Sequence, residues 1–408
     1  MTSTPHAPNS LTRRGLIRAG AAAGLVASPL MFAPAALGQA PGGAGNRILV
    51  VLELTGGNDG LNTVIPYGDD AYYRHRPKIG IRKERVRKLD DHFGLSEGMT
   101  GFERLYKDGK LAIVHGCGYA DPSFSHFTSM AYWQTAAPNS GEQYGWVGRL
   151  ADQMAPSAPA NFLINIGATQ SLAVRAHKHV PVVFDNPENF TREMFFEEGA
   201  VLRAPPGGAA GGNASQRYLL DIARSANDAS ALVRKAWADY RSPVDYGITD
   251  LGLRRVSAMI AAGLPARLYY TAYANNAFDT HVVQNDQHPR MLTYTSDAVS
   301  AFMQDMERLG RADDVTLMIF SEFGRRVPEN TSLGTDHGAA NVMFVAGKKV
   351  KGGHYGELPS LTKLDAGDNL VFTTDFRRVY GTMAQNWLKQ PPSPDLLNGT
   401  FQPFDLIA

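Results

Sequence analysis

Cysteine is almost absent from this chain, since Cys117 is the only one among 408 residues. No disulfide can therefore form within the chain, and cysteine-based zinc or iron–sulfur sites are excluded. A bound metal would have to be held by histidine, aspartate and glutamate, and the chain has 11 histidines.

An excess of charge is also missing, because 40 Lys and Arg residues stand against 39 Asp and Glu residues and the formal net charge is +1. Nucleic-acid binding by bulk charge is therefore not expected. The strongly basic stretch 74–88 (RHRPKIGIRKERVRK) is either a solvated loop or a region that attracts anions. Hydrophobic residues make up 44% of the chain, enough for one large core or two modest ones.

Long apolar runs are missing after residue 38, so no membrane span is expected in the mature chain. Residues 1–38 contain three arginines and no acid, and they end in small apolar residues typical of a cleavage site. The run 12–18 (TRRGLIR) resembles a twin-arginine export signal. We expect export by the twin-arginine translocase, a periplasmic or extracellular location, and a linker at 39–46. An uncleaved amphipathic or membrane helix is the alternative.

Short β-rich apolar runs alternate with helical patterns along the mature chain. This alternation predicts an α/β fold with a mostly parallel central sheet, whose functional groups gather beyond the carboxyl ends of the strands. A helix is expected at 291–309 from its three- and four-residue apolar spacing. We expect one domain over 47–408, with a flexible loop at about 198–216 around PPGGAAGG and a helical insertion at about 217–262. The predicted strands are 47–54, 111–115, 162–166, 267–273, 315–320 and 342–346.

Acidic residues and histidines follow several of these runs. Asp279 and His281 are two residues apart after the run 267–273, so in an extended segment both side chains can face one cation. Glu322 directly follows the run 315–320 and is either a site residue or a structural acid paired with Arg325 or Arg326.

Two further candidates lie in polar loops. His337, in GTDHG before the last predicted strand, is either a metal ligand or a loop histidine bound to backbone. Ser125 stands at a predicted helix start, where it is either a nucleophile beside free backbone N–H groups or a helix cap.

The order of these motifs resembles the secreted domain-of-unknown-function 1501 (DUF1501) family. The blocks that carry the resemblance are VVLELTGGNDGLNTVIPY, AIVHGCGYADPSFSHF, GWVGRLAD, AFDTH, FSEFGRRVPEN, GTDHGAANVMFVAG and TTDFRRVY. The family is similar to the alkaline phosphatase and sulfatase superfamily. That similarity implies a three-layer α/β sandwich with a metal site at the carboxyl ends of the strands, transferring phosphoryl or sulfuryl groups.

The resemblance also implies roles for single residues. Asp279 and His281 with His337 would hold a first metal, and Ser125 would be the nucleophile. Asp59 or Glu53, with Glu322, would hold a second metal.

Two further roles are implied nearby. Asp336 would be an extra ligand or would orient His337, and Arg325 would clamp the anion. The residue after Glu322 is Phe323, which cannot bind a metal although the superfamily usually has a ligand there.

The expected function is that of an exported metal-dependent hydrolase of phosphate or sulfate esters, acting on an anionic small molecule. The expected cofactor is one or two divalent cations, zinc first and manganese or iron as alternatives. A second hypothesis is a non-catalytic exported binding or assembly protein with a degenerate site, and a third is a metal-free Ser-His-Asp esterase.

Overall fold

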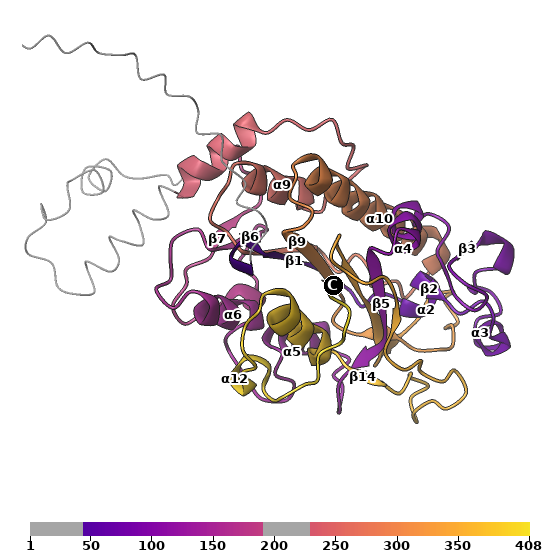
Figure 1. The fold of residues 1–408 in the computed structure, drawn as a ribbon. Coiled ribbons are helices and arrows are strands. Elements are labelled where there is room, and N and C mark those ends of the chain that lie inside the picture. Colours follow the sequence, from indigo (N-terminus) through magenta and orange to yellow (C-terminus); the bar gives the residue numbers. More distant parts are fainter. Residues whose placement is uncertain (1–43, 191–228) are drawn as a thin grey trace, which may run out of the picture. The chain divides into compact units, whose positions relative to one another are not determined.

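The computed structural model describes residues 44–190 and 229–408 (Figure 1). The chain divides into the units Met1–Ala40 and Pro41–Ala408, and all described residues belong to the second. The predicted export signal, most of the predicted linker, the predicted loop at 198–216 and the first part of the predicted insertion lie outside the described residues.

A nine-stranded sheet forms the centre of the described part of the chain, in the order β13-β5-β12-β9-β1-β8-β6-β7, with β14 paired to β5. The strands β9, β1, β8, β6 and β7 run parallel to one another, and β12 runs antiparallel to both of its neighbours. The predicted α/β class with a mostly parallel sheet is therefore confirmed. The strands are β1 (Ile48–Leu54), β5 (Leu111–Gly118), β6 (Leu163–Ile166), β7 (Val182–Phe184), β8 (Leu268–Tyr273), β9 (Val315–Phe320), β12 (Asn341–Ala346), β13 (Gly353–Tyr355) and β14 (Thr374–Asp375).

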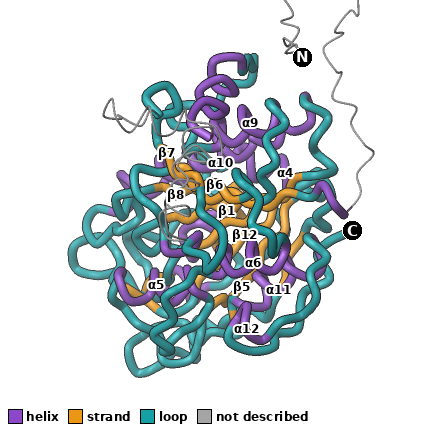
Figure 2. Tube along the Cα trace, turned by 90° about the vertical axis from the view of Figure 1, so that its left-hand side faces the viewer, coloured by secondary structure: helices purple, strands orange, loops and turns teal. Residues whose placement is uncertain are grey.

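Helices cover both faces of this sheet, which gives three layers (Figures 1 and 2). All seven residues of β1 are buried, and alternate side chains enter two different cores, as expected of a strand covered on both faces. One core contains residues of α4 (Thr100–Lys107), α9 (Leu253–Ala261) and α10 (Gln284–Arg308). The other contains residues of α5 (His126–Thr135), α6 (Trp146–Met154), α11 (Arg377–Gly381), the π-helical turn Thr382–Trp387 and α12 (Pro394–Leu397).

The α10 helix begins at Gln284, well before the predicted start at residue 291. Its first turns read QNDQHPR, so they lack the apolar spacing on which the prediction depends, and they include Pro289. Within the predicted insertion, residues 229–239 and α9 are helical.

Short elements complete the described fold. A two-stranded sheet pairs β10 (Gly324–Arg325) with β11 (His337–Gly338), which places Arg325 opposite His337. No helix within the two described ranges is long and apolar enough to cross a membrane. The remaining elements are α2 (Gly60–Thr63), α3 (Asp70–His75), the small sheet of β2 (Val64–Ile65), β3 (Arg87–Lys88) and β4 (Gly94–Leu95), and the 3-10 turns Ala44–Asn46, Lys83–Arg85 and Leu172–Val174.

Candidate metal centre

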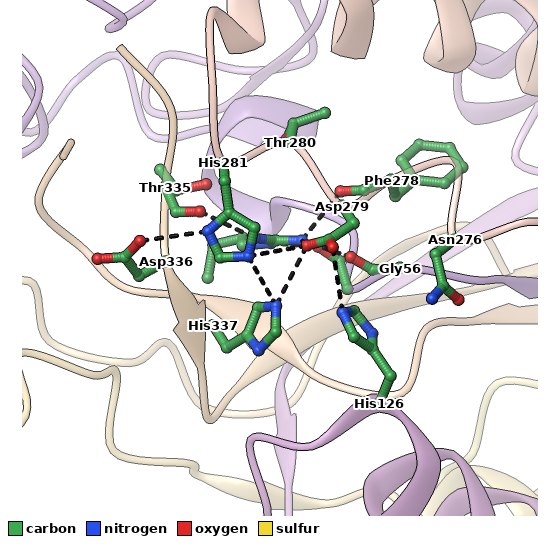
Figure 3. Close-up of polar contacts among 12 residues, drawn as sticks. Gly56, His126, Asn276, Phe278, Asp279, Thr280, His281, Thr335, Asp336 and His337 are labelled. Carbon is green, nitrogen blue, oxygen red and sulfur yellow. Dashed lines mark hydrogen bonds and ion pairs between the residues drawn. The ribbon is translucent and has the colours of Figure 1, made fainter. Parts of the chain in front are cut away.

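Three imidazoles and a carboxylate meet where several parallel strands end (Figure 3). His126 is the first residue of α5, Asp279 and His281 lie in the loop after β8, and His337 begins β11. The carboxyl ends of parallel strands share one edge of a sheet, so side chains far apart in the sequence converge there.

Asp279 is the centre of this group. Its Oδ1 lies 3.1 Å from Nε2 of His337 and 3.0 Å from Nε2 of His281, and its Oδ2 lies 3.3 Å from Nε2 of His126. The two Nε2 atoms of His281 and His337 are only 2.9 Å apart. We call His126, Asp279, His281 and His337 the histidine–aspartate cluster.

The outward nitrogen of His126 is held by a buried acid. Its Nδ1 lies 2.8 Å from Oε1 of Glu322, which is fully buried and also accepts a hydrogen bond from the backbone N–H of Gly56 at 2.8 Å. This hydrogen bond raises the pKa of His126. When the neutral imidazole donates from Nδ1, its Nε2 lone pair faces Asp279, which is the arrangement that a metal-binding histidine needs.

The other two imidazoles are held in the same way. Nδ1 of His281 lies 3.2 Å from Oδ1 of Asp336, and Nδ1 of His337 lies 2.7 Å from the carbonyl oxygen of Phe124. Asn330 donates to the same Asp336 oxygen at 3.1 Å and fixes it. Each imidazole of the cluster therefore has an acceptor on Nδ1 and turns Nε2 inward.

These contacts fit a bound cation. Nε2 of His126 is buried and makes no hydrogen bond within the described residues, although Oδ2 of Asp279 lies 3.3 Å away. The ligand atoms of His126, Asp279 and His337 all lie within 4.8 Å of one another, a separation that one metal ion can bridge. Partial burial raises the pKa of Asp279, but the hydrogen bonds from Arg325 and His337 outweigh it and lower that pKa to about 2, so the carboxylate is ionised. Imidazole with carboxylate suits zinc, manganese or iron.

Arg325 packs beside the cluster and donates hydrogen bonds to Asp279 and to backbone carbonyls. Its guanidinium donates to Oδ1 of Asp279 at 2.8 Å and to the carbonyl oxygens of Gly56, Gly57, Phe278 and Thr335. Only 2% of the residue is exposed. The sequence prediction that Arg325 clamps a substrate anion is not supported by this arrangement, because the guanidinium is buried and Nε, Nη1 and Nη2 all donate within the protein. Arg325 holds Asp279 instead.

Glu322 and Asp336, both predicted as metal ligands, stand behind the cluster. Each carboxylate contacts the Nδ1 side of a histidine, Glu322 that of His126 and Asp336 that of His281. Asp336 thus orients His281, whereas the sequence suggested an extra ligand or a support for His337. Acids in this position fix the tautomer and direction of a ligand without binding the metal themselves.

Asp59, predicted to hold a second metal, instead stabilises the fold through an ion pair and a helix cap. It is fully buried, its Oδ2 lies 2.6 Å from Nη1 of Arg76, and its Oδ1 caps α2 by accepting from the N–H of Leu61. Gln284 donates to the same Oδ2 at 2.6 Å. Burial raises the pKa of Asp59, but the charge of Arg76 and these hydrogen bonds outweigh it and the pKa is lowered. Because its negative charge is paired with Arg76 and both of its oxygens accept hydrogen bonds, this carboxylate has little capacity left for a cation.

Glu53, the alternative acid at the end of β1, is also away from the cluster. It is 1% exposed, and its Oε2 accepts hydrogen bonds from Gln134 at 2.9 Å and from the hydroxyl of Tyr270. Burial, with the nearby charge of Glu322, raises the pKa of Glu53 to about 8. The carboxyl is therefore protonated at neutral pH.

Phe323 forms an apolar wall of the cluster at the place where the superfamily usually has a ligand. It is buried, and its ring centre lies 4.9 Å from that of His126 and 4.6 Å from that of His337. It also fills the space over Gly57, where an added Cβ would stand 2.2 Å from Cε2 of Phe323. Phe323 therefore fixes two imidazoles by packing.

Ser125 is exposed at the N-cap of α5, next to His126 in the sequence. Its side chain does not cap the helix, and the first N–H groups of an α-helix have no partner within the helix. The hydroxyl is therefore beside a helix end that favours anions.

His126 is the member of the cluster that the sequence analysis missed as a ligand. From this segment only Ser125 was singled out at the sequence level, as a nucleophile or a helix cap. The signal that would have found it is its place at a helix start after β5, another parallel strand whose carboxyl end lies at the same edge.

A second histidine pair lies outside the cluster. Nε2 of His115 is 2.7 Å from Nδ1 of His354, whose Nε2 is 3.2 Å from Oδ2 of Asp90. Both rings stack on Phe93, and burial lowers the pKa of His115 to about 3. His115 also lines a cavity of about 60 Å³. Among the described residues these side chains do not form a set of three whose ligand atoms lie close enough together to hold one ion.

Comparison with known proteins agrees with the family resemblance. Residues 260–378 match the sequence model of the family described as "Protein of unknown function (DUF1501)", which confirms the predicted resemblance over this segment. The segment contains Asp279, His281 and His337 but not His126. Comparison with curated proteins gives no match.

Solved structures similar to this chain include members of the superfamily named from the sequence. The C-terminal periplasmic domain of EcEptC from Escherichia coli in complex with Zn has 13% identity, covering 74% of each chain, with a TM-score of 0.36. The PsFucS1 sulfatase from Pseudoalteromonas sp. has 12% identity, covering 89% of this chain and 72% of that one, with a TM-score of 0.37. A protein in the alkaline phosphatase superfamily from Vibrio parahaemolyticus has 10% identity, covering 77% and 63%, with a TM-score of 0.35. At this level of similarity, the side chains of the present chain have to carry any statement about function.

Proposed function

We propose that this chain is an exported, metal-dependent hydrolase of phosphate or sulfate esters. The observation that carries the proposal is the convergence of Asp279 with the Nε2 atoms of His126, His281 and His337, each imidazole being fixed from behind by its own acceptor. A histidine that serves only the fold does not need to turn its second nitrogen toward two other imidazoles and a carboxylate.

The cluster is open to solvent on one side, which favours catalysis over a purely structural metal. The side chain of His281 is 39% exposed and that of Asp279 is 30% exposed, whereas Glu322 behind them is fully buried. Structural metal sites are closed by protein ligands, and catalytic sites keep a position for water or substrate.

Ser125 is the proposed nucleophile, supported by its place at the open helix end beside His126. A divalent cation in the cluster would supply positive charge that polarises the ester and favours the ionised nucleophile. In the first step Ser125 Oγ releases its proton to solvent and bonds to phosphorus or sulfur, while the ester bond breaks and the leaving alcohol oxygen takes a proton from solvent. Water then hydrolyses the Ser125 ester and restores the hydroxyl.

Two observations favour the second candidate, a non-catalytic exported binding protein with the same metal centre. The Ser125 hydroxyl makes no hydrogen bond to a base within the described residues, and the guanidinium of Arg325 is buried and donates to Asp279. The same absence of a base argues against the metal-free Ser-His-Asp esterase, since His126 donates to Glu322 and points its other nitrogen at Asp279.

The test is hydrolysis of aryl phosphate and aryl sulfate esters by purified protein loaded with zinc, manganese or iron. We expect Ser125→Ala to keep the metal content and lose at least about 100-fold in kcat/KM. Thr128→Ala is the matched control, because Thr128 is an exposed hydroxyl residue in the first turns of the same helix, and it should behave as wild type. Full activity in Ser125→Ala would remove the serine mechanism. No hydrolysis with any metal would favour the binding protein.

A further inference from the structure

Exposed hydrophobic side chains gather around the histidine–aspartate cluster. Ten large hydrophobic residues are exposed in the described part of the chain, and four of them stand within two sequence positions of a cluster histidine. The fifth is Leu333, whose carbonyl oxygen accepts a hydrogen bond from the backbone N–H of Gln284. We call these five residues the apolar rim: Phe124, Phe127, Val282, Val283 and Leu333.

Backbone contacts bring the three rim segments together. The carbonyl oxygen of Phe124 accepts from Nδ1 of His337 at 2.7 Å. The N–H of Val283 donates to the carbonyl of Ser332 at 3.0 Å, and the next N–H along the chain donates to the carbonyl of Leu333 at 2.8 Å. The rim segments are therefore tied by hydrogen bonds to the segments that carry His281 and His337.

The rim is held in place at a cost in backbone strain. Val283 and Leu333 both have positive φ angles, +45° and +60°, which non-glycine residues seldom adopt and which are especially unfavourable for β-branched valine. Asn330 fixes the loop by donating to the carbonyl of His281 and accepting from the N–H groups of Ser332 and Gly334, at 2.9–3.0 Å. A strained loop that presents apolar side chains to solvent indicates a surface built to bind.

The chemistry of the two neighbouring surfaces defines the ligand. A cation in the cluster attracts an anionic group, and the adjoining rim gains free energy only by covering hydrocarbon. A polar substrate such as a free sugar ester would leave the rim in water.

Resting on the proposed function, we propose that the apolar rim binds the hydrocarbon part of an amphiphilic ester, a single alkyl phosphate or alkyl sulfate molecule whose anionic group reaches the metal centre. Ser125, between Phe124 and His126, then lies where the polar head and the hydrocarbon chain join.

The test is calorimetric titration of zinc-loaded protein with methyl-, butyl- and octylphosphonate, all below their micelle concentrations. The phosphonate P–C bond is not hydrolysed, so the measurement reports binding alone. A fully buried methylene contributes about fourfold in affinity, and the rim is open on one side, so we expect octylphosphonate to bind at least about tenfold more tightly than methylphosphonate.

The matching variant is Phe127→Ser with Val282→Ser. These side chains are 90% and 56% exposed, so their loss removes little internal packing. We expect the octyl-to-methyl affinity ratio to fall by at least about threefold. The control is Ile248→Ser, which is 79% exposed. Its neighbour Gly247 packs on Asp297, about 20 Å along α10 from the start of the helix, and this variant should keep the wild-type ratio.

The outcomes separate this inference from the proposed function. Equal binding of all three phosphonates, or an unchanged ratio in the double variant, would overturn the inference and leave the hydrolase proposal standing. No binding of any phosphonate to protein with full metal content would overturn both. Binding of octylphosphonate only when it is embedded in phosphatidylcholine vesicles would replace the single-molecule ligand with a membrane surface and overturn the inference.

Discussion

Replacing Glu322 by glutamine tests the support of the metal centre with the smallest change in shape. The carboxylate is fully buried and accepts from Nδ1 of His126, from the N–H of Gly56 and from the hydroxyl of Ser321, at 2.8–3.0 Å. Glutamine keeps one oxygen for His126 and Gly56, and its amide can donate to Ser321. The variant therefore removes the negative charge while the hydrogen-bonding geometry is largely kept.

The expected result is weaker metal binding without unfolding. Loss of a carboxylate behind a ligating histidine typically costs 10- to 100-fold in metal affinity, or about 1.4–2.7 kcal/mol. The assay is competition for zinc between the protein and a chelator of known affinity, with circular dichroism as the check on folding.

Glu53→Gln is the matched control for this experiment. It also changes a buried glutamate to its amide, but Glu53 contacts Gln134 and Tyr270 and no cluster residue. Zinc affinity should stay at the wild-type value in this control. Wild-type affinity in folded Glu322→Gln would refute the role assigned to the carboxylate.

Three further predictions concern the surroundings of the cluster. Asp336→Asn should weaken zinc binding by less than Glu322→Gln does, about 3- to 10-fold in the same competition assay, because this acid is partly exposed and its charge is screened. The raised pKa of Glu53, about 8 against 4.5, means that its contribution to stability is complete below pH 4.5 and is lost as the pH rises through 8. Urea unfolding at pH 5 and pH 8.5 should therefore show a smaller loss of stability in Glu53→Gln than in wild type, and equal losses would contradict the assignment. Gly57→Ala should lower both stability and zinc affinity, because φ is +71° and the new Cβ would meet the ring of Phe323; Gly109→Ala, with φ +70° and open space, should cost only about 1 kcal/mol and spare the metal.

The sheet could be predicted from the sequence because its strands are continuous apolar runs. Every residue of 48–54 and 315–320 is buried, so apolar residues dominate both runs and make them easy to recognise. The helix α10 was placed too late because its first turns are polar, so only its tertiary contacts show that it starts at Gln284.

The site was predictable only in part, because sequence shows which residues end strands but not which way their side chains turn. Asp279, His281 and His337 were expected to meet, and the structure brings them together. The roles of Arg325 and Asp59 depend on partners distant in the sequence, the carbonyls around Asp279 for one and Arg76 for the other. No local sequence pattern predicts such distant partners.

The most direct test of the central claim is the metal content of the purified protein and of a His281→Ala, His337→Ala double variant, measured by elemental analysis after incubation with zinc and manganese. The control is His92→Ala, an exposed histidine outside the cluster. The account predicts close to one divalent cation per chain in wild type and in the control, and almost none in the double variant. A folded wild-type protein that binds no metal, or a double variant that retains the full amount, would contradict it.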